Sequence, residues 1–169
     1  LSDALVFLAE ARALALSALG EPSSGDASYA YRVWGGLLWD LAQDQVGGEN
    51  AFYQASLFVA DGPQRYARDL KAFSGSTGAI EGLLARVAQI GGDPASDKRR
   101  AALLIEAATM AQEAGNHERA LGCAADAINT DPSRADAVVI VERSAHAPGG
   151  FDLLDRTYDR LADAAFGKY

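Results

Sequence analysis

The residues that most often carry out chemistry are few in this chain and far apart in sequence. His117 and His146 are the only histidines, and Cys123 is the only cysteine. Zinc-binding histidines on one helix typically lie four residues apart, and neither histidine has such a neighbour. One cysteine forms no intrachain disulfide and builds no cysteine-based zinc site. The spacing therefore predicts no metal ion. We expect His117 to begin a helix on the surface and Cys123 to be a small core residue.

Patterns typical of enzymes and cofactor-binding proteins are missing as well. Ser74-Gly75-Ser76 lacks the Gly-x-Ser-x-Gly arrangement of a nucleophile elbow, and the glycine pairs match no phosphate-binding or dinucleotide-binding fingerprint. Asp40 and Asp44 lie one helical turn apart, a spacing that could hold a cation, although an exposed helix face is the simpler interpretation. We therefore expect a protein without catalytic residues and without a cofactor.

Charge and hydropathy exclude two classes of partner. The net charge of -8 disfavours nucleic acid, which needs a positive surface. No stretch approaches about 18 uninterrupted apolar residues, so no transmembrane helix is expected. The apolar segment 1–19 lacks a basic leader and is a poor signal peptide. These features favour a cytoplasmic protein, and the start at Leu1 suggests a domain excised from a longer protein or a processed product.

The elements that must position these residues are helices. The chain holds 35 Ala and only 5 Pro, the best and the worst helix formers, and its 12 Arg against 3 Lys suggest a bacterial source. The apolar periodicity is helical nearly throughout. It predicts helices over about 1–19, 26–46, 49–60, 63–73, 78–90, 96–114, 117–129, 133–145 and 151–166.

Three local features of these helices can be checked. Segment 1–19 is apolar on two adjacent faces, which predicts a helix packed between two neighbours. Glycine pairs are expected to permit a kink or a close helix approach at Gly35-Gly36 and to end a helix at Gly47-Gly48. Residues 74–78 are expected to form a flexible connector. The buried stripe of the second helix is predicted to be Val33, Trp34, Leu37, Leu38, Leu41 and Ala42, with Trp39 packing on a neighbouring helix.

One pattern extends over residues 101–134. A large apolar Leu104 stands early in the first helix, Gly115 falls between two helices, and Asp131-Pro132 closes the unit. Small residues stand where two helices of a hairpin need to come close, at Ala108, Ala120 and Ala127. This segment resembles the tetratricopeptide repeat, a 34-residue helical hairpin. It departs from the family at Ala111 and Ala124, where aromatic residues are usual.

The resemblance weakens on either side of this unit. Residues 135–168 keep the length, the turn glycine at Gly149 and the aromatic Tyr158, whereas 61–94 is similar only in outline. The fold it implies is all-α, with antiparallel helical hairpins stacked as a right-handed superhelix, and the alternative is a closed helical bundle. We expect divergent hairpins over 1–60 and tetratricopeptide-like repeats over 61–169, in one continuous domain.

In this family the inner helix of each hairpin lines a groove that receives a peptide or a partner helix. The matching positions are expected to be exposed, have a mixed character and include no cluster of Lys and Arg that would clamp a terminal carboxylate. They are Ala102, Ile105, Glu106, Thr109, Gln112 and Glu113 in one unit, and Asp136, Val139, Ile140 and Arg143 in the next.

The function expected from the resemblance is that of a non-catalytic protein-interaction scaffold or a segment of a longer solenoid. Its partner would be a protein or peptide, with no nucleic acid and no membrane. Two alternatives remain open at this point. One is a helical-bundle enzyme or ligand-binding domain with a pocket formed by residues 1–60. The other is a peripheral membrane protein attached through its first helix.

Overall fold

The computed structural model describes residues 2–19 and 24–166 and contains eight α-helices and no strand within these ranges. The all-α prediction is therefore confirmed. The helices are α1 (Ser2–Ala18), α2 (Ser24–Asp40), α3 (Gln45–Ser56), α4 (Gly62–Gln89), α5 (Pro94–Glu113), α6 (His117–Thr130), α7 (Ala135–Ser144) and α8 (Gly150–Phe166). None of the described helices is long and apolar enough to cross a membrane.

The helices belong to two compact units, Leu1–Gly75 and Ser76–Tyr169. The break falls inside α4 at Gly75, whose φ of 70° and ψ of 177° are non-helical. Only glycine adopts this backbone conformation readily. The predicted connector over 74–78 is thus wrong in extent, because the residues on both sides of Gly75 are helical. The expected boundary near residue 60 lies within the first unit, and the division into two kinds of repeat stays a prediction.

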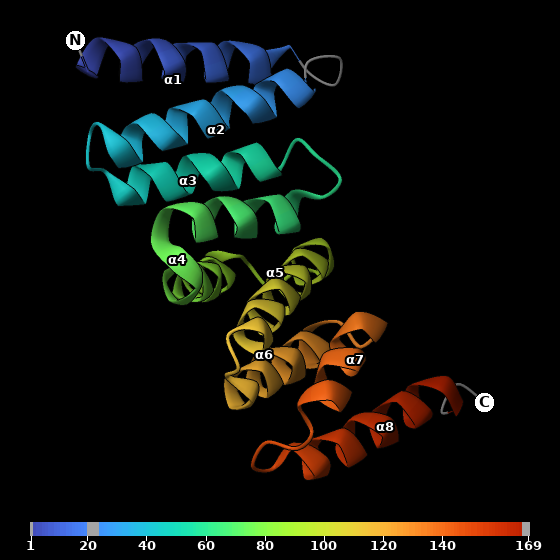
Figure 1. The fold of residues 1–169 in the computed structure, drawn as a ribbon. Helices are drawn as coiled ribbons and strands as arrows, with labels where there is room; N and C mark the ends of the chain where they lie inside the picture. Colours follow the sequence, from blue (N-terminus) through green and yellow to red (C-terminus); the bar gives the residue numbers. More distant parts are fainter. Residues whose placement is uncertain (1, 20–23, 167–169) are drawn as a thin grey trace. The chain divides into compact units, whose positions relative to one another are not determined.

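In the first unit, each helix packs against the next one along the chain. Helix α1 contacts α2, and α2 contacts α3. Figure 1 shows these helices side by side, with the chain direction alternating from one to the next. Their shared core consists of Ala13, Ala30, Tyr31, Leu38, Ala51 and Ala55, with Val6, Leu16, Trp34 and Phe58 packed against it.

Helices α2 and α3 approach closely at two glycines. A Cβ added at Gly35 would lie 3.0 Å from the carbonyl oxygen of Gly48 and 2.6 Å from the ring of Phe52. The expected close approach at Gly35-Gly36 is thereby confirmed for Gly35. The expected helix end at Gly47-Gly48 is wrong, because both glycines lie in the first turn of α3. Asp44 caps this turn, since its side chain accepts a hydrogen bond from Gly47 N at 2.9 Å.

Helix α1 is more exposed than its sequence predicts. Only Ala13 of this helix is fully buried, whereas Phe7 is 68% and Leu8 63% exposed. The prediction that α1 packs between two neighbours is wrong for the described residues, because α2 covers one side only. The stripe predicted for the second helix needs a similar correction, since Val33, Leu41 and Ala42 are exposed. Helix α2 ends at Asp40, so Leu41 and Ala42 no longer follow its periodicity.

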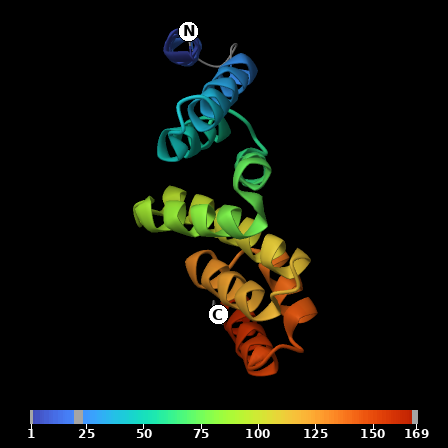
Figure 2. The same ribbon diagram turned by 60° about the vertical axis from the view of Figure 1, so that its left-hand side comes forward.

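In the second unit, helices pack against their first and second neighbours. Helix α5 contacts α6 and α7, and α8 contacts α6 and α7. Figure 2 shows α6 beside α7 and α8. Gly115 between α5 and α6 has a φ of 75°, as its turn position requires. Asn116 then caps α6 by accepting a hydrogen bond from Arg119 N at 3.1 Å.

The small residues of the α5–α6 hairpin pack as the sequence predicts. Ala108, Ala120 and Ala127 are all 0% exposed. Cys123 is 5% exposed, which confirms it as a core residue. Burial raises the pKa of its thiol. Alanine at these three positions lets the two backbones come close, while larger buried side chains such as Leu104 and Leu121 fill the rest of the core. The right-handed superhelix itself stays a prediction.

Candidate functional site

The residues predicted to line a groove lie on two helices that contact each other, α5 and α7. Glu106, Thr109 and Glu113 follow one another at spacings of three and four residues and so share a face of α5. Val139, which is 41% exposed, and the exposed Arg143 lie one turn apart on α7. The structure thus leaves these five side chains exposed or partly exposed on two helices that contact each other.

The remaining predicted positions on α5 and α7 are less accessible. Ile105 is 5% exposed, and Ala102 and Ile140 are also buried, so the expectation that these three are exposed groove positions is wrong. Gln112 is partly buried and donates a hydrogen bond from Nε2 to the hydroxyl of Ser144 at 3.0 Å. Because Ser144 is 0% exposed, this bond satisfies a hydroxyl that would otherwise be costly to bury. The contact joins α5 to α7, and no spacing in the sequence indicates it.

An ion pair marks the start of α7. Arg134 donates hydrogen bonds to both carboxylate oxygens of Asp136, Nε at 3.0 Å and a terminal nitrogen at 2.6 Å. The bonds from Arg134 hold the pKa of the Asp136 carboxyl below its ordinary value. The negative charge of Glu106 also favours the charged form of Arg134. Helix α5 therefore carries two acidic residues on one side, while α7 carries the exposed Val139 and Arg143 and begins at the Arg134–Asp136 ion pair.

The two histidines, which lie 29 positions apart in sequence, meet in the second unit. The ring centroids of His117 and His146 are 4.3 Å apart, and the ring planes are inclined by 66°. A cavity of about 540 Å³ is lined by residues 114–118 and 146–148. His117 begins α6 as predicted, but its side chain is partly buried, whereas that of His146 is exposed. Helical spacing could not reveal this pair, because His117 begins α6 whereas His146 lies in the turn between α7 and α8.

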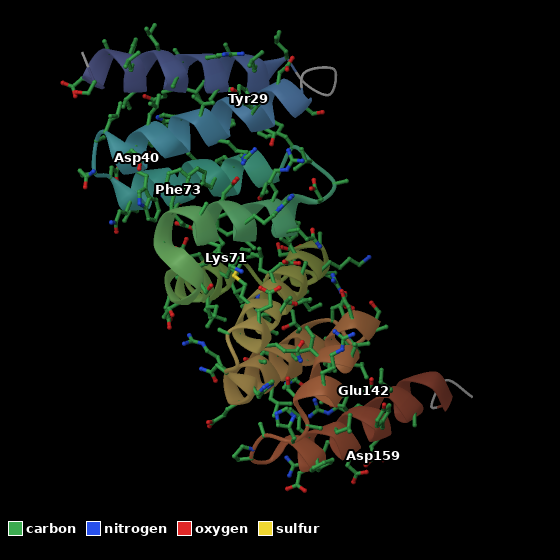
Figure 3. The ribbon with its side chains drawn as sticks, viewed as in Figure 1. Tyr29, Asp40, Lys71, Phe73, Glu142 and Asp159 are labelled. Atoms are coloured by element: carbon green, nitrogen blue, oxygen red, sulfur yellow. The ribbon has the colours of Figure 1, made fainter. Side chains whose placement is uncertain are left out.

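The first unit has a smaller cavity beside a partly buried ion pair. Arg32 donates to the carboxylate of Asp69 at 2.7 Å and 2.6 Å, and Asp69 is only 6% exposed. The cavity measures about 220 Å³. It is lined by Tyr29, Arg32, Val33, Phe52, Asp69 and Phe73, of which Tyr29 and Phe73 are labelled in Figure 3. Arg32 and Asp69 neutralise each other's charge, and their two hydrogen bonds join α2 to α4.

Trp39, predicted to pack on a neighbouring helix, and Asp44, a candidate for a cation site, serve in packing and helix capping. Trp39 packs against Phe52 and Phe73, with ring centroids at 6.3 Å and 5.7 Å, which confirms its predicted contact with neighbouring helices. Asp44 is occupied as the cap of α3, and Asp40 is exposed. Within the described ranges, no three His, Cys, Asp or Glu side chains are grouped so as to hold a metal ion.

Comparisons of the chain with protein-family models, with curated proteins and with solved structures found no match. The function must therefore be argued from the geometry of the chain itself.

Proposed function

We propose that this chain is a non-catalytic protein-interaction module of the tetratricopeptide type, which binds a segment of a partner protein across α5 and α7. The observation that supports the proposal is the direct contact of α5 with α7, the first helices of the segments 101–134 and 135–168. The packing of α5 against α6 and α7, and of α6 against α8, agrees with a stacked helical array.

The chemistry of this face favours a partner of a particular kind. Val139 offers an apolar contact, while Glu106 and Glu113 place negative charge along α5. A helix or extended peptide with a small apolar residue flanked by Lys or Arg would match both features. Because Gln112 and Ser144 hold the two helices together before binding, little ordering cost falls on the module.

The test compares two double charge reversals with the same change in net charge. One variant carries Glu106→Lys and Glu113→Lys on the proposed face. The control carries Asp155→Lys and Asp159→Lys, two exposed positions on α8, of which Asp159 is labelled in Figure 3. Affinity capture followed by binding measurements with the recovered partner should show a loss for the face variant and none for the control. If both variants bind the partner like the wild type, the α5–α7 assignment is wrong.

A further inference from the structure

We propose that His117 and His146 form a site for a divalent transition-metal ion such as Zn²⁺, Ni²⁺ or Cu²⁺, held by one imidazole nitrogen from each side chain. These are the only histidines of the chain, and the fold brings them together from the first residue of α6 and the turn between α7 and α8. Such a site would lie outside the α5–α7 face and would be independent of the proposed partner.

The ring geometry is close to what shared coordination requires. Two imidazoles that bind one ion at about 2.0–2.1 Å have ring centres roughly 5 Å apart. The observed separation is 4.3 Å, with planes inclined by 66°. A correction of about 1 Å is within reach of a change in the side-chain torsions of the exposed His146.

A second observation concerns hydrogen bonding at His117. Its Nδ1 is buried and has no hydrogen-bond partner. A buried polar nitrogen without a partner is costly, and structures usually satisfy such atoms with a protein group, water or an ion. The adjoining cavity of about 540 Å³ has ample room for an ion with bound water.

The surroundings suit a cation of borderline softness. Imidazole is a preferred ligand of zinc, copper and nickel, in contrast to magnesium and calcium, which prefer oxygen. Glu118 lines the same cavity and adds a negative charge near the ion. Because no third His, Cys, Asp or Glu joins the pair among the described residues, water must complete the coordination shell. The bound ion would link the start of α6 to the segment that follows α7.

Calorimetric titration of the full chain with Zn²⁺, and separately with Ni²⁺, tests the proposal. We expect one ion per chain, and at least a tenfold loss of affinity on His146→Ala, a variant that folds because its side chain is exposed. Pro148→Ala, which alters the same cavity without removing a ligand atom, should bind like the wild type. Cu²⁺ loaded at equal ratio should give a spin-resonance spectrum with splitting from two nitrogens, reduced to one in His146→Ala.

Two results would overturn the assignment. One is the absence of saturable binding at millimolar metal, which would show that the imidazoles contact each other without sharing an ion. The other is binding that persists in both His117→Ala and His146→Ala but disappears in Cys123→Ser. That pattern would assign the ion to the thiol of Cys123, which the proposed site does not use.

Discussion

Neighbouring glycines in α2 allow a matched test of the packing argument. Gly35 and Gly36 are adjacent interior positions of the same helix, so replacing either one with Ala brings a similar gain in helix propensity of about 1 kcal/mol. Their surroundings differ. A Cβ at Gly35 would lie 2.6 Å from Cε1 and 2.7 Å from Cδ1 of Phe52, whereas a Cβ at Gly36 meets only Cζ of Phe73 at 3.4 Å.

The ring of Phe52 has little freedom to move away. It is 1% exposed and packs between Trp39 and Phe73, with centroid distances of 6.3 Å and 5.0 Å. The carbonyl oxygen of Gly48 closes the space from the other side at 3.0 Å. Overpacking of a rigid core costs about 1–3 kcal/mol. After the gain in propensity, we expect Gly35→Ala to lower the free energy of unfolding by about 0–2 kcal/mol, and Gly36→Ala to raise it by up to about 1 kcal/mol.

The assay is urea denaturation of the full chain followed by tryptophan fluorescence. Both tryptophans, Trp34 and Trp39, lie on α2, so the fluorescence reports on the first unit alone. Gly35→Ala should unfold at a lower urea concentration than the wild type, and Gly36→Ala at the same or a higher one. Equal effects of the two substitutions, or a larger loss for Gly36→Ala, would refute the close packing of α2 on α3.

Three further outcomes are expected. Asp69→Ala should lower the stability of the first unit by about 1.5–3 kcal/mol in the same fluorescence assay, because Arg32 loses two charge-assisted hydrogen bonds; an unchanged midpoint would contradict this. Hydrogen bonds from neighbouring serines lower the pKa of Asp93 and Asp131 in the folded protein. The stability that these two carboxylates give the fold is therefore complete above their unfolded pKa of about 3.9, and it is lost as the pH falls through the lower folded value. Replacing both with Asn should therefore flatten the acid dependence of the urea midpoint measured by circular dichroism, and an unaltered slope would count against these contacts. Burial and the raised pKa of Cys123 predict slow reaction with a maleimide in the native protein and fast reaction in denaturant, and equal rates would argue against a buried thiol.

Local signals in the sequence were sufficient to predict most helices of the second unit. The predicted helix over 117–129 matches α6 within one residue, because Asn116 and the glycine before it are strong boundary residues. The left-handed Gly115 and the buried Ala108, Ala120 and Ala127 follow from the same spacing. The family resemblance, the groove and the partner remain proposals, since they depend on what the α5–α7 face binds.

The glycine pairs show where local signals fail. By composition, Gly47-Gly48 resembles a helix end, yet Asp44 begins a helix there and Gly48 faces Gly35 across the contact of α2 with α3. Helix caps and helix–helix contacts use the same small residue for different reasons. Sequence alone does not indicate which of the two applies.

By itself, the sequence determined that the chain is helical and that alanines and one turn glycine form a close hairpin, because backbone propensity and apolar period act over a few residues. Only the tertiary structure decided that one face of α1 is left uncovered, that Gln112 bonds Ser144, and that His117 lies against His146. The Gln112–Ser144 and His117–His146 contacts join residues about 30 positions apart. They depend on how whole helices stack, which no local spacing specifies.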